Sequence, residues 1–127
     1  MAILKKSLKT ARGWSQWRPV KNANVFVDVD LTLVDAQGKL YPGAGEALQR
    51  LKDEGCHLFL WSSVGMEYAQ KVATVHRLTC LFEGYSAKPD IIIDDMPNTT
   101  KAPFEYSVQP ELPWLALAAQ IIDKHID

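Results

Sequence analysis

The stretch that decides the fold is Asn24-Val25-Phe26-Val27-Asp28-Val29-Asp30-Leu31-Thr32. Val and Phe fill four of its first six positions, and runs of β-branched and aromatic residues favour a strand. Successive side chains of an extended chain alternate between two faces, so Asp28 and Asp30 share one face. The stretch therefore predicts a strand that ends in two carboxylates projecting into one crevice.

Strands and helices alternate along the rest of the chain. Apolar residues at i, i+3, i+4 and i+7 from Ala44 predict an amphipathic helix, and residues 57–61 are an apolar run typical of a strand covered on both faces. This alternation implies crossovers between parallel strands. We therefore expect an α/β fold, a single three-layer α/β/α Rossmann-like domain over residues 1–127 with a mainly parallel sheet. The further elements expected are a helix at 66–76, strands at 79–82, 91–93 and 104–108, and a closing helix at 113–126.

The composition is that of an ordinary globular protein. With 47% hydrophobic and 23% charged residues, the chain is neither disordered nor fibrous, and at roughly 150 residues per domain it forms one domain. No apolar run reaches the roughly 18 residues of a membrane span, so we expect no membrane association. Cys56 and Cys80 are too few for a disulfide scaffold. We expect buried, reduced thiols in a cytoplasmic protein.

The charges are divided unevenly along the chain. Residues 1–21 carry six Lys or Arg and no acid, whereas the rest carries eight Lys or Arg against fifteen Asp or Glu. A basic arm is typical of a nucleic-acid or other anionic partner, and Trp14 and Trp17 are suited to stacking on bases. A solvated segment whose tryptophans pack on the body is the alternative, and an organellar targeting segment is a third. All three stay open.

Polar residues follow three of the expected strands. Open α/β sheets bind ligands at the carboxyl ends of their strands. Those ends carry Asp28, Asp30, Ser62, Asp94 and Asp95. Four carboxylates converging from two strands repel one another unless a cation lies among them. Oxygen ligands suit Mg²⁺, which takes one or two carboxylates with water and phosphate oxygens, so the pattern predicts a magnesium site.

Three stretches resemble, in order, motifs of the haloacid dehalogenase superfamily. Residues 25–33 are similar to its first motif, hydrophobic residues followed by D-x-D-x-T-L. Residues 58–63 are similar to its second, a hydrophobic strand that ends in Ser or Thr, and residues 91–95 to its fourth, an acidic strand end. The resemblance extends over residues 25–98, about three-fifths of the chain. It implies a fold like that of this superfamily.

The resemblance also implies a phosphatase mechanism. Asp28 would be the nucleophile that attacks phosphorus and forms an aspartyl-phosphate. Asp30 would protonate the leaving oxygen and then take a proton from the hydrolytic water. Because dehalogenase members lack this second acid, Asp30 favours a phosphatase. Ser62 would donate a hydrogen bond to a phosphate oxygen.

A set of Mg²⁺ ligands follows from the same resemblance. They would be the carboxylate of Asp28, the backbone carbonyl of Asp30 and the carboxylate of Asp95. Asp94 would lie outside the direct coordination, or the roles of Asp94 and Asp95 would be exchanged. Thr32 would brace the turn after the first strand.

The third motif is the imperfect part of the resemblance. The family neutralises phosphate charge with a Lys or Arg, and Lys88 is the natural candidate as a phosphate-binding residue. Only seven residues separate it from Asp95, and ~23 Å of extended chain is too long for a lysine to reach back across. The strand must therefore be short, or the chain must fold around Pro89. Lys101 and Lys39 are the alternatives.

Neither gap between the motifs has room for a cap domain. Residues 35–57 hold a loop and one helix, and residues 63–88 hold one helix and a short strand. We expect a capless protein whose site is open to solvent and to bulky substrates. A lid from a second subunit, and hence an oligomer, stays open as an alternative.

Two classes of function follow. The leading hypothesis is a Mg²⁺-dependent phosphomonoesterase acting on a phosphorylated substrate of unknown class, which includes a nucleic-acid end held by residues 1–21. The alternative is a catalytically degenerate module that binds metal and phosphate without turnover. A receiver-type regulatory domain also combines acids, Mg²⁺ and a lysine, but the order of these residues along the chain disfavours it.

Overall fold

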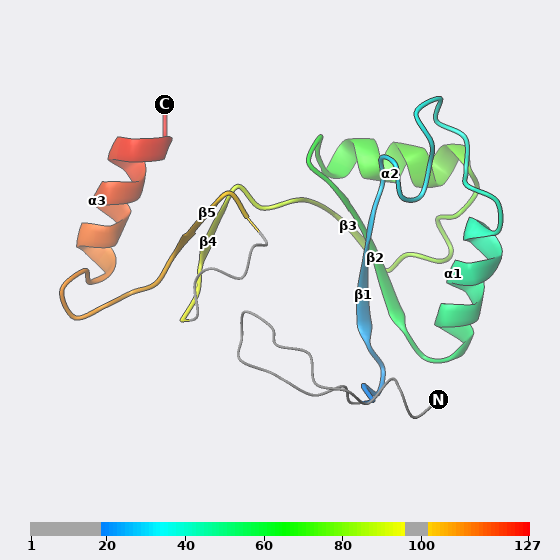
Figure 1. Ribbon diagram of the computed structural model, residues 1–127, viewed down its shortest axis with the longest axis horizontal. Coiled ribbons are helices and arrows are strands. Elements are labelled where there is room, and N and C mark those ends of the chain that lie inside the picture. Colours follow the sequence, from blue (N-terminus) through cyan, green and yellow to red (C-terminus); the bar gives the residue numbers. More distant parts are fainter. Residues whose placement is uncertain (1–18, 96–101) are drawn as a thin grey trace, which may run out of the picture. The chain divides into compact units, whose positions relative to one another are not determined.

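The computed structural model describes residues 19–95 and 102–127 (Figure 1). The chain divides into two compact units. We name the described parts of residues 18–88 and 89–127 the N-terminal unit and the C-terminal unit, and each is described by itself. The predictions for the basic arm, apart from its last residues, and for Lys101 lie outside the described residues.

A parallel three-stranded sheet forms the centre of the N-terminal unit. Its strands are β1 (Asn24–Asp28), β2 (His57–Ser62) and β3 (Gly84–Ala87), in the order β1-β2-β3. Helix α1 (Ala44–Asp53) connects β1 to β2, and α2 (Met66–Val75) connects β2 to β3. Parallel neighbours need such crossovers. The prediction of an α/β fold with a parallel sheet is therefore confirmed.

The connections in this unit are short. Between β1 and α1 the chain makes a tight turn and two isolated bridges, which pair Asp30 with Val34 and Val34 with Leu40. Only residues 63–65 lie between β2 and α2. Both crossover connections lie wholly within the described residues, and neither contains an inserted domain.

The core of the N-terminal unit lies between the sheet and its two helices. Burial alternates along β2, where Leu58, Leu60 and Ser62 are buried and the residues between them are half-buried. Helices α1 and α2 both contact β2, and α2 also contacts β3. Ala69 and Ala73 of α2 are completely buried, and their small side chains let the helix approach the sheet closely.

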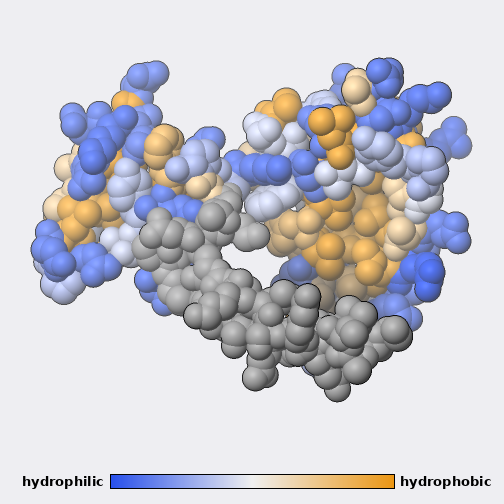
Figure 2. Space-filling model, viewed as in Figure 1, coloured by the Kyte–Doolittle hydropathy of each residue, from blue (hydrophilic) through white to orange (hydrophobic). Residues whose placement is uncertain are grey.

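Aromatic side chains gather on the other face of the sheet. Phe26 of β1 stacks on Phe59 of β2 with ring centroids 4.9 Å apart, and its ring lies 5.1 Å from that of Trp61. Phe26 is half exposed, and Figure 2 shows hydrophobic residues gathered over β1 and β2. Within this unit the helices therefore cover one face of β2, whereas the sequence predicted cover on both.

The predicted strand at residues 79–82 is wrong. These residues form a turn after α2 in which Leu81 and Phe82 are buried, and β3 follows at Gly84–Ala87. An apolar run indicates burial, which a turn provides as well as a strand, and the Gly, Ser and Ala of β3 have weak strand propensity. Cys80 is exposed in the same turn and Cys56 is half-buried, so the expectation of two buried thiols is wrong.

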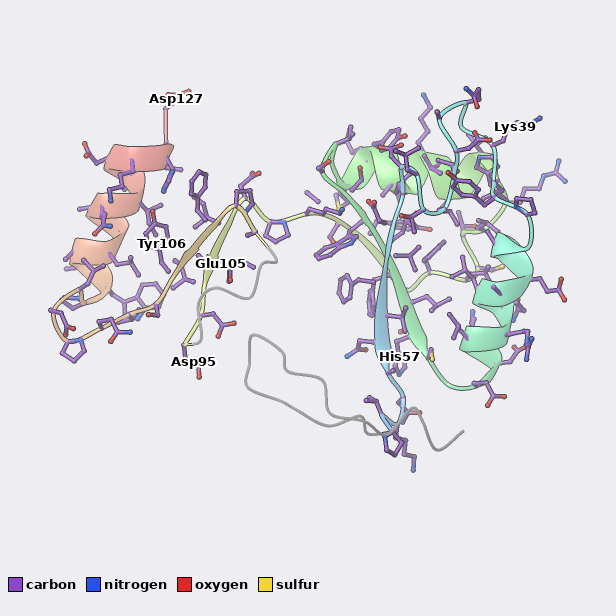
Figure 3. The ribbon with its side chains drawn as sticks, in the orientation of Figure 1. Lys39, His57, Asp95, Glu105, Tyr106 and Asp127 are labelled. Atoms are coloured by element: carbon purple, nitrogen blue, oxygen red, sulfur yellow. The ribbon has the colours of Figure 1, made fainter. Side chains whose placement is uncertain are left out.

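The C-terminal unit contains a second, smaller parallel sheet. Strand β4 (Ile91–Ile93) pairs with β5 (Phe104–Tyr106), and α3 (Trp114–His125) follows. Tyr106 of β5, which Figure 3 labels, shares a hydrogen bond with His125 at the end of α3. No helix in the described residues combines the length and the apolar character that a membrane span requires.

Leu60 tests the assignment of the core, because it is completely buried in β2. Leu60→Ala should lower the free energy of unfolding by about 2–5 kcal/mol, since it removes buried methyl groups and leaves a cavity. Val75→Ala, at an exposed position in α2, should change it by less than about 0.5 kcal/mol. Urea unfolding followed by circular dichroism measures both, and equal effects would contradict the assignment.

Candidate active site

Three polar side chains lie at the carboxyl edge of the β1-β2-β3 sheet. Asp28 ends β1, Ser62 ends β2, and Lys88 directly follows β3. The register pairs Asp28 with Trp61 and Ser62 with Ala87, so the three strand ends are aligned to within a residue or two. Since all three strands run in one direction, these side chains share the edge at which open α/β sheets bind ligands.

Lys88 and Asp28 form an ion pair across this edge. The Lys88 Nζ lies 3.1 Å from the Asp28 Oδ1, and both side chains are 35% exposed. The backbone N–H of Lys88 donates to the carbonyl of Ser62 at 3.0 Å. The ammonium of Lys88 lies 5.9 Å from the centroid of the Trp61 ring, within cation–π range. Exposure limits the stabilisation from such a pair to about 0–1 kcal/mol, so its importance lies in where it places the two charges.

Strand β3 explains how Lys88 reaches Asp28. Lys88 directly follows this strand, and the pairing of β3 with β2 brings it to Asp28 without involving the chain between Lys88 and Asp95. Lys39, an alternative, lies in the loop after β1, where Asp35 accepts its backbone N–H at 2.9 Å (Figure 3). Of the two candidate lysines in the described residues, Lys88 is the one whose ammonium contacts the expected nucleophile, Asp28.

A tight turn after β1 presents Asp30. The carbonyl of Val29 accepts the N–H groups of Leu33 and Val34 at 3.0 and 3.1 Å, and Leu31 N–H donates to Val34 at 2.8 Å. Leu31 has a φ of 60°, a left-handed conformation that costs a residue with a side chain roughly 1–2 kcal/mol. The hydrogen bonds and the burial of Val29 hold this turn in place. Backbone strain of this kind is typical of functional sites.

Thr32 in the same turn faces Asp28. Its Oγ1 lies 3.5 Å from the Asp28 Oδ2, at the long limit of a hydrogen bond. This contact agrees with the expectation that Thr32 braces the turn. It also leaves the Asp28 carboxylate with one oxygen toward Lys88 and the other toward Thr32.

Ser62 is the most buried of the expected site residues, at 1% exposure. Its Oγ accepts the backbone N–H of Val64 at 3.0 Å and so closes the turn between β2 and α2. The hydroxyl hydrogen remains available to a further acceptor, since a serine hydroxyl donates once and accepts twice. Ser62 therefore has a structural contact in addition to its expected role toward phosphate.

Tyr68 is a site residue that the sequence did not indicate. It lies on α2, and its hydroxyl donates to the Asp30 Oδ1 at 2.6 Å. This hydrogen bond, then burial and then the negative charge of Asp30 raise the pKa of Tyr68 above its ordinary value. One signal was present: a tyrosine in the first turn of a helix that starts just after Ser62 must lie near the carboxyl edge, and a partly buried phenol seeks a partner.

Asp94 and Asp95 follow β4 in the C-terminal unit. The Asp94 N–H donates to the carbonyl of Tyr106 at 2.8 Å, and both acids line a pocket with Val108 and Trp114 of the same unit. Their predicted part in a metal site with Asp28 stays a prediction from the sequence. In the described residues there is no group of three or more His, Cys, Asp and Glu arranged to hold a metal ion.

Comparisons of the chain with protein-family models, curated proteins and solved structures found no match. The family resemblance thus rests on the three sequence motifs alone. What the structure adds is independent of that resemblance: a parallel α/β sheet whose carboxyl edge gathers Asp28, Asp30, Ser62, Lys88 and Tyr68.

The contact between Tyr68 and Asp30 is testable without any substrate. Asp30→Ala removes both the hydrogen bond and the charge that raise the pKa of Tyr68, so that pKa should fall toward the ordinary value of about 10. Tyr85 is the matched control, because burial and not Asp30 is the main cause that raises its pKa. Carbon NMR of the tyrosine rings in an alkaline titration measures both. An unchanged Tyr68 would contradict the contact.

Proposed function

We propose that this protein is a Mg²⁺-dependent phosphomonoesterase of the haloacid dehalogenase type, in which Asp28 is the nucleophile and Asp30 the general acid and base. The observation that carries the proposal is the ion pair between Lys88 and Asp28 at the carboxyl edge of the sheet. It supports the proposal because the ion pair holds the expected nucleophile, Asp28, next to the positive charge of Lys88, which a phosphate substrate would need.

The chemistry of the proposal is a double displacement. A carboxylate oxygen of Asp28 attacks phosphorus, the bond from phosphorus to the leaving oxygen breaks, and Asp30 gives its proton to that oxygen. Water then attacks the aspartyl-phosphate, Asp30 takes a proton from the water, and inorganic phosphate leaves with Asp28 restored. Covalent catalysis divides one difficult displacement into two easier ones, and a positioned acid–base group contributes about 10²–10⁴-fold.

Lys88 and Ser62 would bind the transferring phosphoryl group. The positive charge of Lys88 would offset charge on the equatorial oxygens, which is the main requirement for catalysis of phosphoryl transfer. Its partial exposure beside Asp28 supports this role, since a phosphate that approaches the carboxylate meets the ammonium at the same edge. The free hydroxyl hydrogen of Ser62 would donate to a further phosphate oxygen.

The donor set at the edge fits Mg²⁺ in its chemistry. Carboxylate and carbonyl oxygens are the ligands this ion prefers, and it needs only one or two carboxylates beside water and phosphate. We propose the Asp28 carboxylate and the Asp30 carbonyl of this edge as ligands, and the Asp95 carboxylate, or that of Asp94 in its place, as the third ligand that the resemblance implies. When bound, the ion would neutralise the repulsion between a phosphate and the nucleophile.

The absence of an inserted domain at the carboxyl edge of the β1-β2-β3 sheet affects the size of substrate that we expect. No domain is inserted in either crossover of the N-terminal unit, so neither crossover supplies a cap over the phosphate. We propose that the protein accepts bulky phosphorylated substrates. Nucleic-acid ends remain one candidate through the basic residues 1–21, and a small metabolite under a lid from a second subunit remains another.

Hydrolysis of 4-nitrophenyl phosphate with and without Mg²⁺ tests the proposed function. The wild type should show metal-dependent turnover, and Asp28→Asn should reduce it to background because the amide is not a nucleophile. Asp53→Asn, at the end of α1, is the matched control and should keep wild-type activity. Absence of turnover with this ester and with a panel of phosphorylated metabolites and oligonucleotides, while Mg²⁺ still binds, would favour the degenerate binding module.

A lysine series tests which residue supplies the positive charge. Lys88→Gln should lower kcat/KM by about 10²–10³-fold, the usual cost of losing one preorganised donor to transition-state charge. Lys71→Gln, on the exposed surface of α2, is the control for loss of a positive charge. The same change at Lys101 and Lys39 separates the alternatives, since a larger loss at either one would reassign the role.

A further inference from the structure

We propose that Tyr68 is a positioning residue that gives the two carboxyl oxygens of Asp30 different tasks. By donating to Oδ1, Tyr68 leaves Oδ2 as the oxygen that exchanges a proton with the substrate and with water. This inference rests on the proposed function, and it names a residue that neither the motifs nor the expected mechanism include. It predicts a substrate dependence that a purely structural tyrosine does not produce.

The position of the phenol is set by the packing of α2. Its neighbour Ala69 and, one turn further on, Ala73 are completely buried against the sheet, and Tyr68 itself is partly buried against the hydrophobic core. Asp30, in contrast, lies exposed on the turn after β1. The well-packed helix therefore holds the exposed carboxyl group, across a sequence separation of 38 residues.

Hydrogen-bond chemistry separates the two oxygens. A tyrosine hydroxyl that donates at 2.6 Å is accepted best by the unprotonated oxygen of a carboxyl group, because the oxygen that carries the proton is the weaker acceptor. When Asp30 carries a proton, that proton is therefore placed on Oδ2, because a proton on Oδ1 would oppose the phenol hydrogen.

The different tasks of the two Asp30 oxygens matter most when the leaving group must be protonated in order to leave. A carboxylic acid that is free to rotate presents its proton in many directions, whereas one held at Oδ1 presents it in a narrow range of directions. Orientation of this kind lowers the activation barrier of proton transfer to the leaving group. An alkoxide or simple phenolate leaves poorly without a proton, but 4-nitrophenolate leaves well. Loss of the Tyr68 hydroxyl should therefore reduce turnover of the first kind of ester and spare the second.

Tyr68→Phe tests the inference with two esters of similar size. It should lower kcat/KM by about 10-fold or more for phenyl phosphate and by less than about 3-fold for 4-nitrophenyl phosphate, as expected for a partial loss of general-acid catalysis. The inhibition constant of inorganic phosphate should stay unchanged, because the phenol does not bind the phosphoryl group. Tyr85→Phe, which removes a hydroxyl from β3 of the same unit, should leave both esters unaffected.

A double-mutant cycle identifies the group through which Tyr68 acts. In an Asp30→Asn background, Tyr68→Phe should cause no further loss of phenyl phosphate hydrolysis, since residues that act as one unit are not additive. Additive losses, or equal losses for the two esters in the single variant, would overturn the role of Tyr68 while leaving the phosphatase intact. A wild type that hydrolyses neither ester nor any member of the substrate panel would overturn the proposed function, and this role with it.

Discussion

Parallel pairing of β1 with β2 and of β2 with β3 is the constraint on which the candidate site depends. It places the three carboxyl ends at one edge, because parallel strands begin and end together when their register is aligned. The buried Leu58 and Leu60 hold β2 between its neighbours, and the completely buried alanines of α2 bring that helix onto the sheet. The hydrophobic core thus positions charged residues that make little contribution to stability themselves.

Partial exposure characterises the charges at this edge. Asp28 and Lys88 each keep about a third of their surface in water, so neither is trapped in a buried pair whose desolvation would oppose exchange of partners. Such a pair holds its groups in place and can still open to an incoming anion. Tyr68 and Asp30 form a second contact at this edge that includes an exposed group, because the donor Tyr68 is well packed and the acceptor Asp30 is exposed. In both pairs a secondary structure element fixes one group, and that group orients the other.

Residues 79–88 are the part of the N-terminal unit in which the sequence predicted the position of a strand incorrectly. The apolar Leu81 and Phe82 suggested a strand, but they fill the core from a turn. The true strand, Gly84–Ala87, has a composition that local propensity does not favour, and it forms because the edge of β2 offers hydrogen bonds to it. Pairing of that strand with β2 places Lys88, which follows it, 3.1 Å from the Asp28 carboxylate.

The pattern of neighbouring residues in the sequence determined much of the fold of this protein. The β-branched run before Asp28, the alternation of strands and helices, and the i, i+2 spacing of Asp28 and Asp30 are properties of neighbouring residues, and they were enough to predict an α/β fold and the edge that carries its acids. The tertiary structure alone decided the partners of those acids. Lys88 and Tyr68 are 60 and 38 residues from Asp28 and Asp30, and no local period records such a distance. Packing of α2 and pairing of β3 bring them together, since contacts of that range arise only when the core has formed.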